Sequence, residues 1–297
     1  MKYTFKQFQA EYPTDEACLN KIMAMKFGGT ELICPACQKP SKFHRVAARR
    51  AYACQFCAHA IYPCVGTPFE HSSTSLSKWF FVMYLMTSTR HGVAAKEVER
   101  QLGVTYKCAW RMCHELRKLM ANADVKGPLG GSKPVEIDET FVGGKHKGHA
   151  AKGGRGGKKA IVFGIVERDG NLRAGTIPEV KARTIEPVVT DNIAPGTTIY
   201  SDTNSSYTKL SAKYGFGHET VAHWREEWAR GPVHVNNLEG HWSRLKASIH
   251  GTHIHVSHKH LWKYASEFSY RRNMRADHAT MFGRLVWAFQ LPHPTAD

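Results

Sequence analysis

Two pairs of cysteines early in the 297-residue chain have a spacing that suits metal binding. Cys34 and Cys37 form the first Cys-x-x-Cys pair, and Cys54 and Cys57 form the second after sixteen intervening residues. Two such pairs offer four thiolates, the ligand set of a structural zinc site with no open coordination position. Free cysteines or two disulfides are the alternatives. The spacing predicts a zinc ribbon that serves folding rather than catalysis.

Acidic side chains farther along the chain form a second candidate site. Asp138 interrupts an alternation of apolar and polar residues over 134–142 that is typical of a β-strand. A carboxylate in a core strand is unusual unless it is paired or binds a metal. Asp202 ends another predicted strand, where an aspartate often serves only a turn or a helix cap. If the two strands are neighbours, the carboxylates share one cleft, and a divalent cation would offset their repulsion.

A third carboxylate lies in a helix that is predicted to begin after Asn236. Glu239, Trp242 and Lys246 share one face of this helix, so the carboxylate could bind metal and the lysine backbone phosphate. Asn236 and Glu239 also have the spacing of a capping box, which leaves a purely structural role open.

These side chains need a scaffold, and the sequence predicts an α+β chain with several domains. The expected order is an N-terminal helix and zinc ribbon at 1–70, a helical region at 71–126 and an RNase H-like α/β domain with a mixed sheet at 133–290. A Gly- and Pro-rich linker precedes the last domain. Four strands are expected in that domain, with one helix before the fourth: 135–142, 160–167, 171–177 and 197–201. Several mixed-sheet folds begin in this order.

Residues 93–112 are typical of a helix-turn-helix, with a short first helix, a turn at Gly103 and a second helix opened by Thr105. In that motif the first residues of the second helix reach base edges. The candidate base-reading residues are therefore Thr105, Tyr106, Lys107 and Arg111. An ordinary helical hairpin is the alternative.

The charge balance predicts a polyanionic partner. Lys and Arg number 41 against 25 Asp and Glu, which gives a net charge of +16. The segment 143–159 holds seven glycines, six basic residues and no acid, so we expect it to clamp a DNA backbone; a solvated linker is the alternative. Its basic residues are Lys145, Lys147, Lys152, Arg155, Lys158 and Lys159. We also expect Trp242, Arg271 and Arg272 to contact DNA.

The sequence shows no secretory signal and no apolar run long enough for a bilayer. Eight cysteines without such a signal fit a reducing compartment. We therefore expect a cytoplasmic, nucleoid-associated protein without a membrane partner.

The acidic motifs resemble those of the DDE transposases of bacterial insertion sequences. The similarity rests on Val-Glu-Ile-Asp138-Glu-Thr, Tyr-Ser-Asp202 and Asn236-Asn-Leu-Glu239-Gly-His-Trp-Ser-Arg-Leu-Lys246, and it extends over nearly the whole chain. The nearest subgroup carries an N-terminal zinc ribbon and an RNase H-like, ISXO2-like transposase domain. Its members have either Glu or Asn at the third acidic position, so the resemblance leaves Glu239 and Asn236 open. We predict Glu239 as the third ligand, because Mg²⁺ prefers a hard, charged oxygen.

The resemblance implies the activity and the cofactors. Two divalent ions, Mg²⁺ or Mn²⁺, would be held by Asp138, Asp202 and Glu239 and would promote cleavage of the terminal inverted repeats and joining to target DNA. A homo-oligomer would pair two ends in a synaptic complex. A transposon-derived DNA-binding regulator without cleavage activity is the alternative. An RNase H-like nuclease or resolvase is less favoured, because it would have no obvious use for both the ribbon and the helix-turn-helix.

Overall fold

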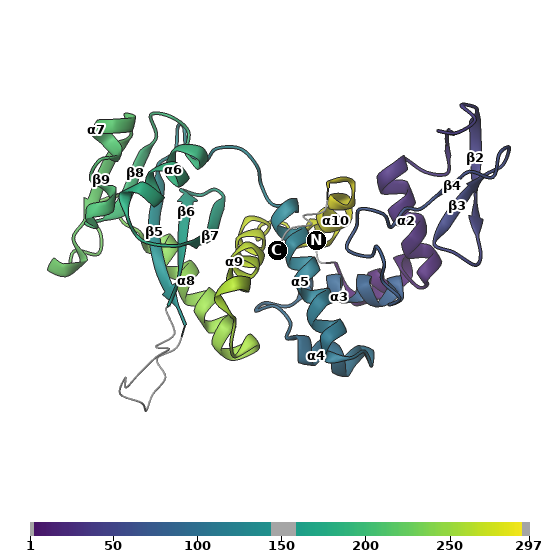
Figure 1. Cartoon of the computed structure of the whole chain (residues 1–297). Coiled ribbons are helices and arrows are strands. Elements are labelled where there is room, and N and C mark those ends of the chain that lie inside the picture. Colours follow the sequence, from purple (N-terminus) through teal and green to yellow (C-terminus); the bar gives the residue numbers. More distant parts are fainter. Residues whose placement is uncertain (1–2, 144–158, 293–297) are drawn as a thin grey trace. The chain divides into compact units, whose positions relative to one another are not determined.

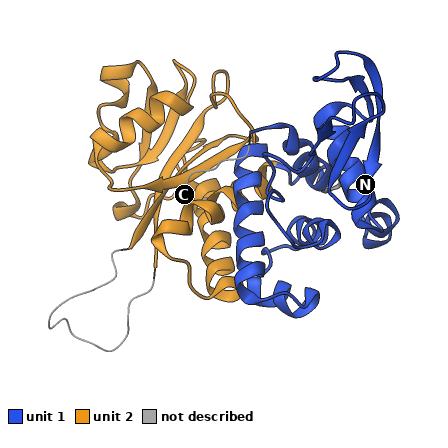
Figure 2. Cartoon of the chain, turned by 45° about the vertical axis from the view of Figure 1, so that its right-hand side comes forward, with its two compact units in different colours: residues 1–123, 274–297 blue, residues 124–273 orange. Residues whose placement is uncertain are grey.

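The computed structural model of the chain describes residues 3–143 and 159–292, with only the backbone of 278 and 279. The chain divides into two compact units: residues 1–123 with 274–297 form unit 1, and 124–273 form unit 2 (Figure 2). Of the predicted basic clamp 143–159, all but the two terminal residues lie outside the described residues.

Unit 1 begins with two helices and a small antiparallel sheet. Helix α1 (Phe5–Glu11) precedes α2 (Asp15–Phe27), which is capped by the side chain of Thr14 and ended by Gly28 in the left-handed region, at φ 78°. The sheet has the order β1-β2-β3-β4 and consists of β1 (Glu31–Ile33), β2 (Pro40–Val46), β3 (Ala51–Cys54) and β4 (Ala60–Ile61). This is the segment in which the cysteine spacing predicts a ribbon.

The rest of unit 1 is helical. Its elements are α3 (Leu76–Ser88), α4 (Ala95–Leu102), α5 (Tyr106–Ala123), α10 (His278–Trp287) and the 3-10 turn η4 (Ala288–Gln290). Asp15 caps α3 by accepting hydrogen bonds from the backbone N–H groups of Leu76 and Ser77, both at 2.9 Å. Phe80 of α3 packs on Phe282 and Phe289, with ring centroids 6.4 and 5.9 Å apart. These contacts place the end of the chain in the same unit as its beginning.

Unit 2 is built on a mixed sheet with the order β7-β6-β5-β8-β9 among the described residues (Figure 1). The strands are β5 (Val135–Val142), β6 (Ala160–Glu167), β7 (Leu172–Ile177), β8 (Thr198–Asp202) and β9 (Gly217–Val221). The first three are antiparallel neighbours, and β8 and β9 continue the sheet in parallel beside β5. The predicted strands are therefore present, and the fourth lies beside the first.

Helices cover both faces of this sheet. They are α6 (Ala182–Asn192), α7 (Leu210–Tyr214), α8 (Asn236–Ser248) and α9 (His258–Asn273), with 3-10 turns η1 (Ser205–Tyr207) and η2 (His223–Arg225) and a π-helical turn η3 (Ile249–His253). Ile137 belongs to the core beneath α6, whereas Val142 belongs to the core beneath α8 and α9. Because side chains alternate along a strand, Asp138 faces α8.

Among the described residues, no helix combines the length and apolar composition that crossing a membrane requires.

Candidate functional site: a tetrathiolate and a carboxylate-bearing sheet

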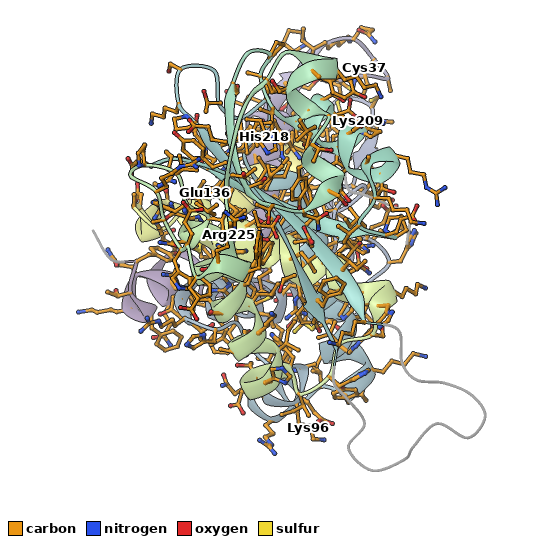
Figure 3. The ribbon with its side chains drawn as sticks, turned by 90° about the vertical axis from the view of Figure 1, so that its left-hand side faces the viewer. Cys37, Lys96, Glu136, Lys209, His218 and Arg225 are labelled. Carbon is orange, nitrogen blue, oxygen red and sulfur yellow. The ribbon has the colours of Figure 1, made fainter. Side chains whose placement is uncertain are left out.

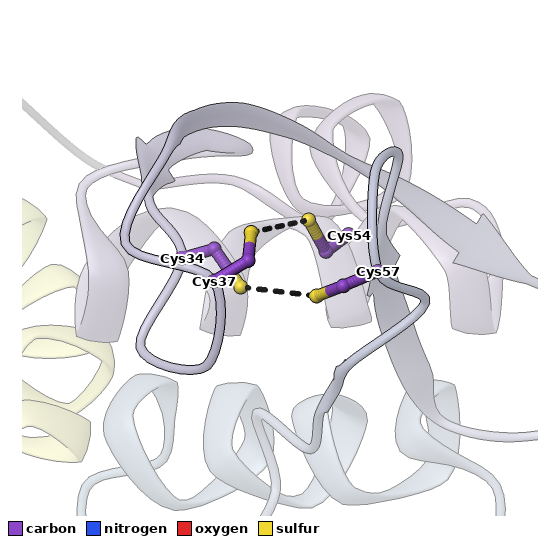
Figure 4. A group of neighbouring side chains, drawn as sticks. All are labelled: Cys34, Cys37, Cys54 and Cys57. Atoms are coloured by element: carbon purple, nitrogen blue, oxygen red, sulfur yellow. Dashed lines mark hydrogen bonds between the residues drawn. The ribbon is translucent and has the colours of Figure 1, made fainter.

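The four predicted zinc ligands converge in unit 1 (Figure 4). Their sulfurs lie within 4.8 Å of one another, with Cys34 Sγ 3.6 Å from Cys57 Sγ and Cys37 Sγ 3.9 Å from Cys54 Sγ. Four sulfurs bound to one tetrahedral zinc at about 2.3 Å would lie about 3.8 Å apart. The donor set and its spacing therefore fit a structural Zn²⁺. The disulfide alternative is wrong, because none of these four cysteines forms a disulfide.

Two equivalent turns produce this geometry. Gln38 N–H donates to Cys34 O at 2.9 Å, and Ala58 N–H donates to Cys54 O at 3.0 Å. Gln38 and Ala58 both lie in the left-handed region, at φ 58° and 57°. Each Cys-x-x-Cys pair thus closes into a tight knuckle that directs two sulfurs to one point.

Asp138 and Asp202 lie on neighbouring parallel strands. The register pairs Glu136 of β5 with Tyr200 of β8, so two residues farther on Asp138 and Asp202 reach the same level and the same face. The pKa of Asp138 is raised to about 7, chiefly by burial. The hydrogen bond from Trp242 lowers this pKa, whereas the negative charges of Glu139 and Asp202 raise it. The charge of Asp202 therefore acts on Asp138 from the neighbouring strand.

Asp202 also serves the turn that follows its strand. Its Oδ1 accepts a hydrogen bond from the N–H of Asn204 at 3.0 Å, and the side chain of Asn204 caps η1. Asn204 Nδ2 donates to Glu139 Oε1 at 3.0 Å, and the hydroxyl of Tyr207 donates to the other oxygen of Glu139. Burial raises the pKa of Glu139. Asp202 therefore stabilises the turn and also acts on Asp138 through its charge.

Trp242 joins α8 to Asp138. Its indole Nε1–H donates to Asp138 Oδ2 at 2.8 Å, and the side chain is only 4% exposed. The ring lies over Gly164, the residue opposite Asp138 in the β5–β6 register. The prediction that Trp242 contacts DNA is therefore corrected, because its ring is buried and its single donor is used within the protein.

The position of Trp242 also orients the other residues of α8. At 3.6 residues per turn, Glu239 and Lys246 lie about 60° and 40° to one side of Trp242, and Leu238 lies to the other side. Leu238 packs over Gly164 of β6, so Glu239 and Lys246 turn toward β8. His223, just after β9, lies on that side: its Nδ1 is 3.8 Å from Glu239 Oε1.

The acidic residues are brought together unequally. Among the described residues, the four cysteines are the one group of three or more His, Cys, Asp or Glu side chains whose ligand atoms converge. The charge of Asp202 acts on Asp138, whereas the carboxylate of Glu239 faces His223 and its side chain is 44% exposed. Asn236 is exposed at the start of α8 and its N–H donates to His234 Nδ1 at 3.3 Å.

Glu136 of β5, labelled in Figure 3, holds the N-terminus of α8 by accepting hydrogen bonds from Asn237 and Leu238. The carboxylate is fully buried, accepts from Asn237 N–H and Nδ2–H at 3.0 and 2.7 Å, and pairs with Arg168 Nε at 3.1 Å. The capping-box interpretation of Asn236 and Glu239 is wrong. Helix α8 begins at Asn236, so the N-cap is Val235, and no side chain caps the helix from that position. Local sequence patterns missed Glu136, since its partners in α8 lie about a hundred residues away.

The predicted DNA contacts differ in exposure. Thr105, Tyr106 and Lys107 are exposed at the start of α5, where Thr105 Oγ1 accepts a hydrogen bond from Cys108 N–H at 3.3 Å. Arg111 is half-buried, with its guanidinium 5.4 Å from the centroid of the Trp79 ring. Arg271 is 9% exposed and binds the buried carboxylate of Glu267 at 2.7 Å.

The position of Arg271 corrects its expected role, because a guanidinium committed to a buried carboxylate is not available to phosphate. Arg272 is half-buried and Lys159 is exposed. The remaining predicted contacts lie outside the described residues: Lys145, Lys147, Lys152, Arg155 and Lys158.

The chain thus combines a zinc ribbon with a separate unit whose mixed sheet carries Asp138 and Asp202 on neighbouring strands. Residues 13–60 match the transposase zinc-ribbon domain, and residues 128–273 match the ISXO2-like transposase domain. The chain is 31% identical over 260 residues to an uncharacterized protein in the transposable element ISH50 of Halobacterium salinarum. The aligned region covers 81% of this chain and 85% of the relative. The chain therefore belongs to the transposase family that joins these two domains.

Proposed function

We propose that this transposase cuts the ends of its insertion sequence and joins them to target DNA by metal-dependent phosphoryl transfer at Asp138, Asp202 and Glu239. The observation that carries the proposal is the placement of Asp138 and Asp202 at one level of neighbouring parallel strands, facing the helix that bears Glu239. The donor set consists of oxygens alone, which suits Mg²⁺ or Mn²⁺. The order of the five strands supports an RNase H-like fold for the domain.

Two divalent ions bound here would activate a water or a DNA 3′-hydroxyl and stabilise the leaving oxygen of an in-line displacement. Asp138 and Asp202 supply fixed oxygens from rigid strands, and Glu239 adds an oxygen from the side of α8 that faces β8. Lys246, one turn beyond Trp242 in α8, would hold a backbone phosphate. No covalent protein intermediate is required.

Recognition of the element ends would belong to unit 1. The helices α4 and α5 are joined by a short turn, and the exposed first turn of α5 presents Thr105, Tyr106 and Lys107. This arrangement supports the helix-turn-helix assignment, in which these residues read bases. Because transposition pairs two ends, we propose that the chain acts as a homo-oligomer on its terminal inverted repeats and on target DNA.

The test is strand transfer with element-end DNA and Mg²⁺, comparing the wild type with Asp138→Asn. We expect the wild type to cut and join and the variant to bind the ends without cutting, because the amide removes a charged ligand. Equal activity of the two proteins would contradict the metal site. End binding without cleavage by either protein would favour the regulator instead.

A further inference from the structure

Trp242 has the geometry of a positioning residue for the metal-binding carboxylate. We propose that its indole N–H fixes the Asp138 carboxylate through Oδ2, leaves Oδ1 directed to the cation, and thereby sets the affinity of unit 2 for Mg²⁺ or Mn²⁺. The inference rests on the proposed function, since it takes Asp138 as a metal ligand. It adds a residue that lies outside the three-carboxylate set.

The chemistry of the indole suits this role. Trp Nε1–H is a donor only and has no lone pair with which to bind a metal, so it occupies one carboxylate oxygen without competing for the cation. The bond to Asp138 is 2.8 Å long, within the range of charge-assisted hydrogen bonds. Trp242 is only 4% exposed, so the bond is shielded from water. Mutation of a group that orients a metal ligand in this way typically costs about 10- to 100-fold in metal affinity or activity.

The sheet is shaped to admit this ring. A Cβ added to Gly164 would lie 2.6 Å from Trp242 Cη2 and 2.7 Å from Cζ2, closer than real Cβ contacts. Gly164 is directly opposite Asp138 in the antiparallel register, so the absence of a side chain at this position of β6 leaves room for the indole, whose Nε1–H reaches Asp138 on β5. The space above Gly164 thus allows the ring to hold one oxygen of the Asp138 carboxylate.

The experiment measures Mn²⁺ binding by the full-length, zinc-loaded protein without DNA, from the electron paramagnetic resonance signal of free Mn²⁺. Trp242→Phe keeps most of the ring volume and removes the donor, and Gly164→Ala keeps the donor and displaces the ring. We expect each variant to raise the Kd for Mn²⁺ about 10-fold or more. With DNA, the cleavage rate of Trp242→Phe at saturating Mn²⁺ should recover toward the wild-type rate, because the ligands remain.

Trp79→Phe is the matched control. Trp79 is also fully buried and also donates its indole N–H, but to Ser72 Oγ at 3.0 Å in unit 1. Trp79→Phe should lose about as much stability as Trp242→Phe, but its Kd for Mn²⁺ should stay at the wild-type value. A general packing defect would affect both variants, whereas a positioning defect affects only the one at Asp138.

The outcomes separate the two proposals. Wild-type Mn²⁺ affinity in Trp242→Phe, with affinity lost in Asp138→Asn, overturns the role of Trp242 and leaves the metal site intact. Wild-type affinity in Asp138→Asn overturns the metal site and the positioning role with it. If Trp242→Phe does not fold, the affinity of Gly164→Ala decides in the same way.

Discussion

Asp138 and Glu136 lie two residues apart on the same face of β5, but their charged neighbours differ. Glu136 is fully buried and is neutralised by Arg168 Nε at 3.1 Å and by backbone N–H groups of α8. Among the described residues, Asp138 makes no ion pair with Lys, Arg or His, and its neighbours Glu139 and Asp202 repel it. A buried carboxylate with a neutral donor and two acidic neighbours is suited to receive a cation.

This imbalance predicts the pH dependence of the metal-free protein. The pKa of Asp138 is raised to about 7 in the folded state, so between about pH 4 and about pH 7 the folded state binds more protons than the unfolded state. The free energy of unfolding should therefore fall as the pH rises through this window, by at most about 1.4 kcal/mol per pH unit from this group. Asp138→Asn should flatten the fall.

Chemical denaturation in a chelator that spares the zinc ribbon, at several pH values in that window, measures the effect. A residual slope is expected in Asp138→Asn, because burial also raises the pKa of Glu139. An Asp138→Asn protein with the full wild-type slope would contradict the prediction.

At the scale of the element, local patterns predicted the strands well and the partners of α8 poorly. The alternation around Asp138 and the two Cys-x-x-Cys pairs are short-range signals, and both were confirmed. The bond from Trp242 to Asp138 spans 104 residues, and that from Asn237 to Glu136 spans 101. Such contacts depend on how α8 crosses the sheet, which no local spacing encodes. The same limit explains Arg271, whose burial follows from the packing of α9.

Glu136 should anchor α8, and Glu136→Gln tests this. The amide keeps the shape but leaves Arg168 beside a neutral group and weakens the bonds from the N–H groups of α8, so we expect a loss of about 2–4 kcal/mol in the free energy of unfolding. Glu219→Gln is the matched control: its side chain is 51% exposed and lies 4.0 Å from Arg230, so its loss should be below about 1 kcal/mol. Equal losses would contradict the anchoring role.

The exposed start of α5 should contribute to DNA binding. Lys107→Ala removes one charge from the proposed recognition helix, so affinity for element-end DNA should fall and the slope of log K against log salt should decrease by about one unit. Lys209→Ala removes an exposed charge in unit 2 as a control. Fluorescence anisotropy at several salt concentrations gives both slopes. If Lys107→Ala does not change the slope, α5 does not contact phosphate through this residue.

At the scale of the whole molecule, the zinc site and the proposed Mg²⁺ site lie in different units. The four cysteines are in unit 1 with α4 and α5, whereas Asp138, Asp202 and Glu239 are in unit 2. The match to the transposase domain, residues 128–273, nearly coincides with unit 2, residues 124–273. Zn²⁺ and Mg²⁺ should therefore stabilise different parts of one chain, and the effects of their removal should be separable.

Removal of zinc should loosen unit 1 and spare unit 2. Without the ion, the knuckles at Cys34 and Cys54 lose the bond that holds them together, and small zinc domains fold only with their metal. Hydrogen exchange of the full-length protein, with and without a zinc chelator, should show faster exchange in β1–β4 and unchanged exchange in β5–β9. Cys37→Ser should reproduce the chelator, while Cys113→Ser, a buried cysteine outside the cluster, should keep one zinc per chain. Unchanged exchange in β1–β4 after measured loss of zinc would contradict the structural role of the ion.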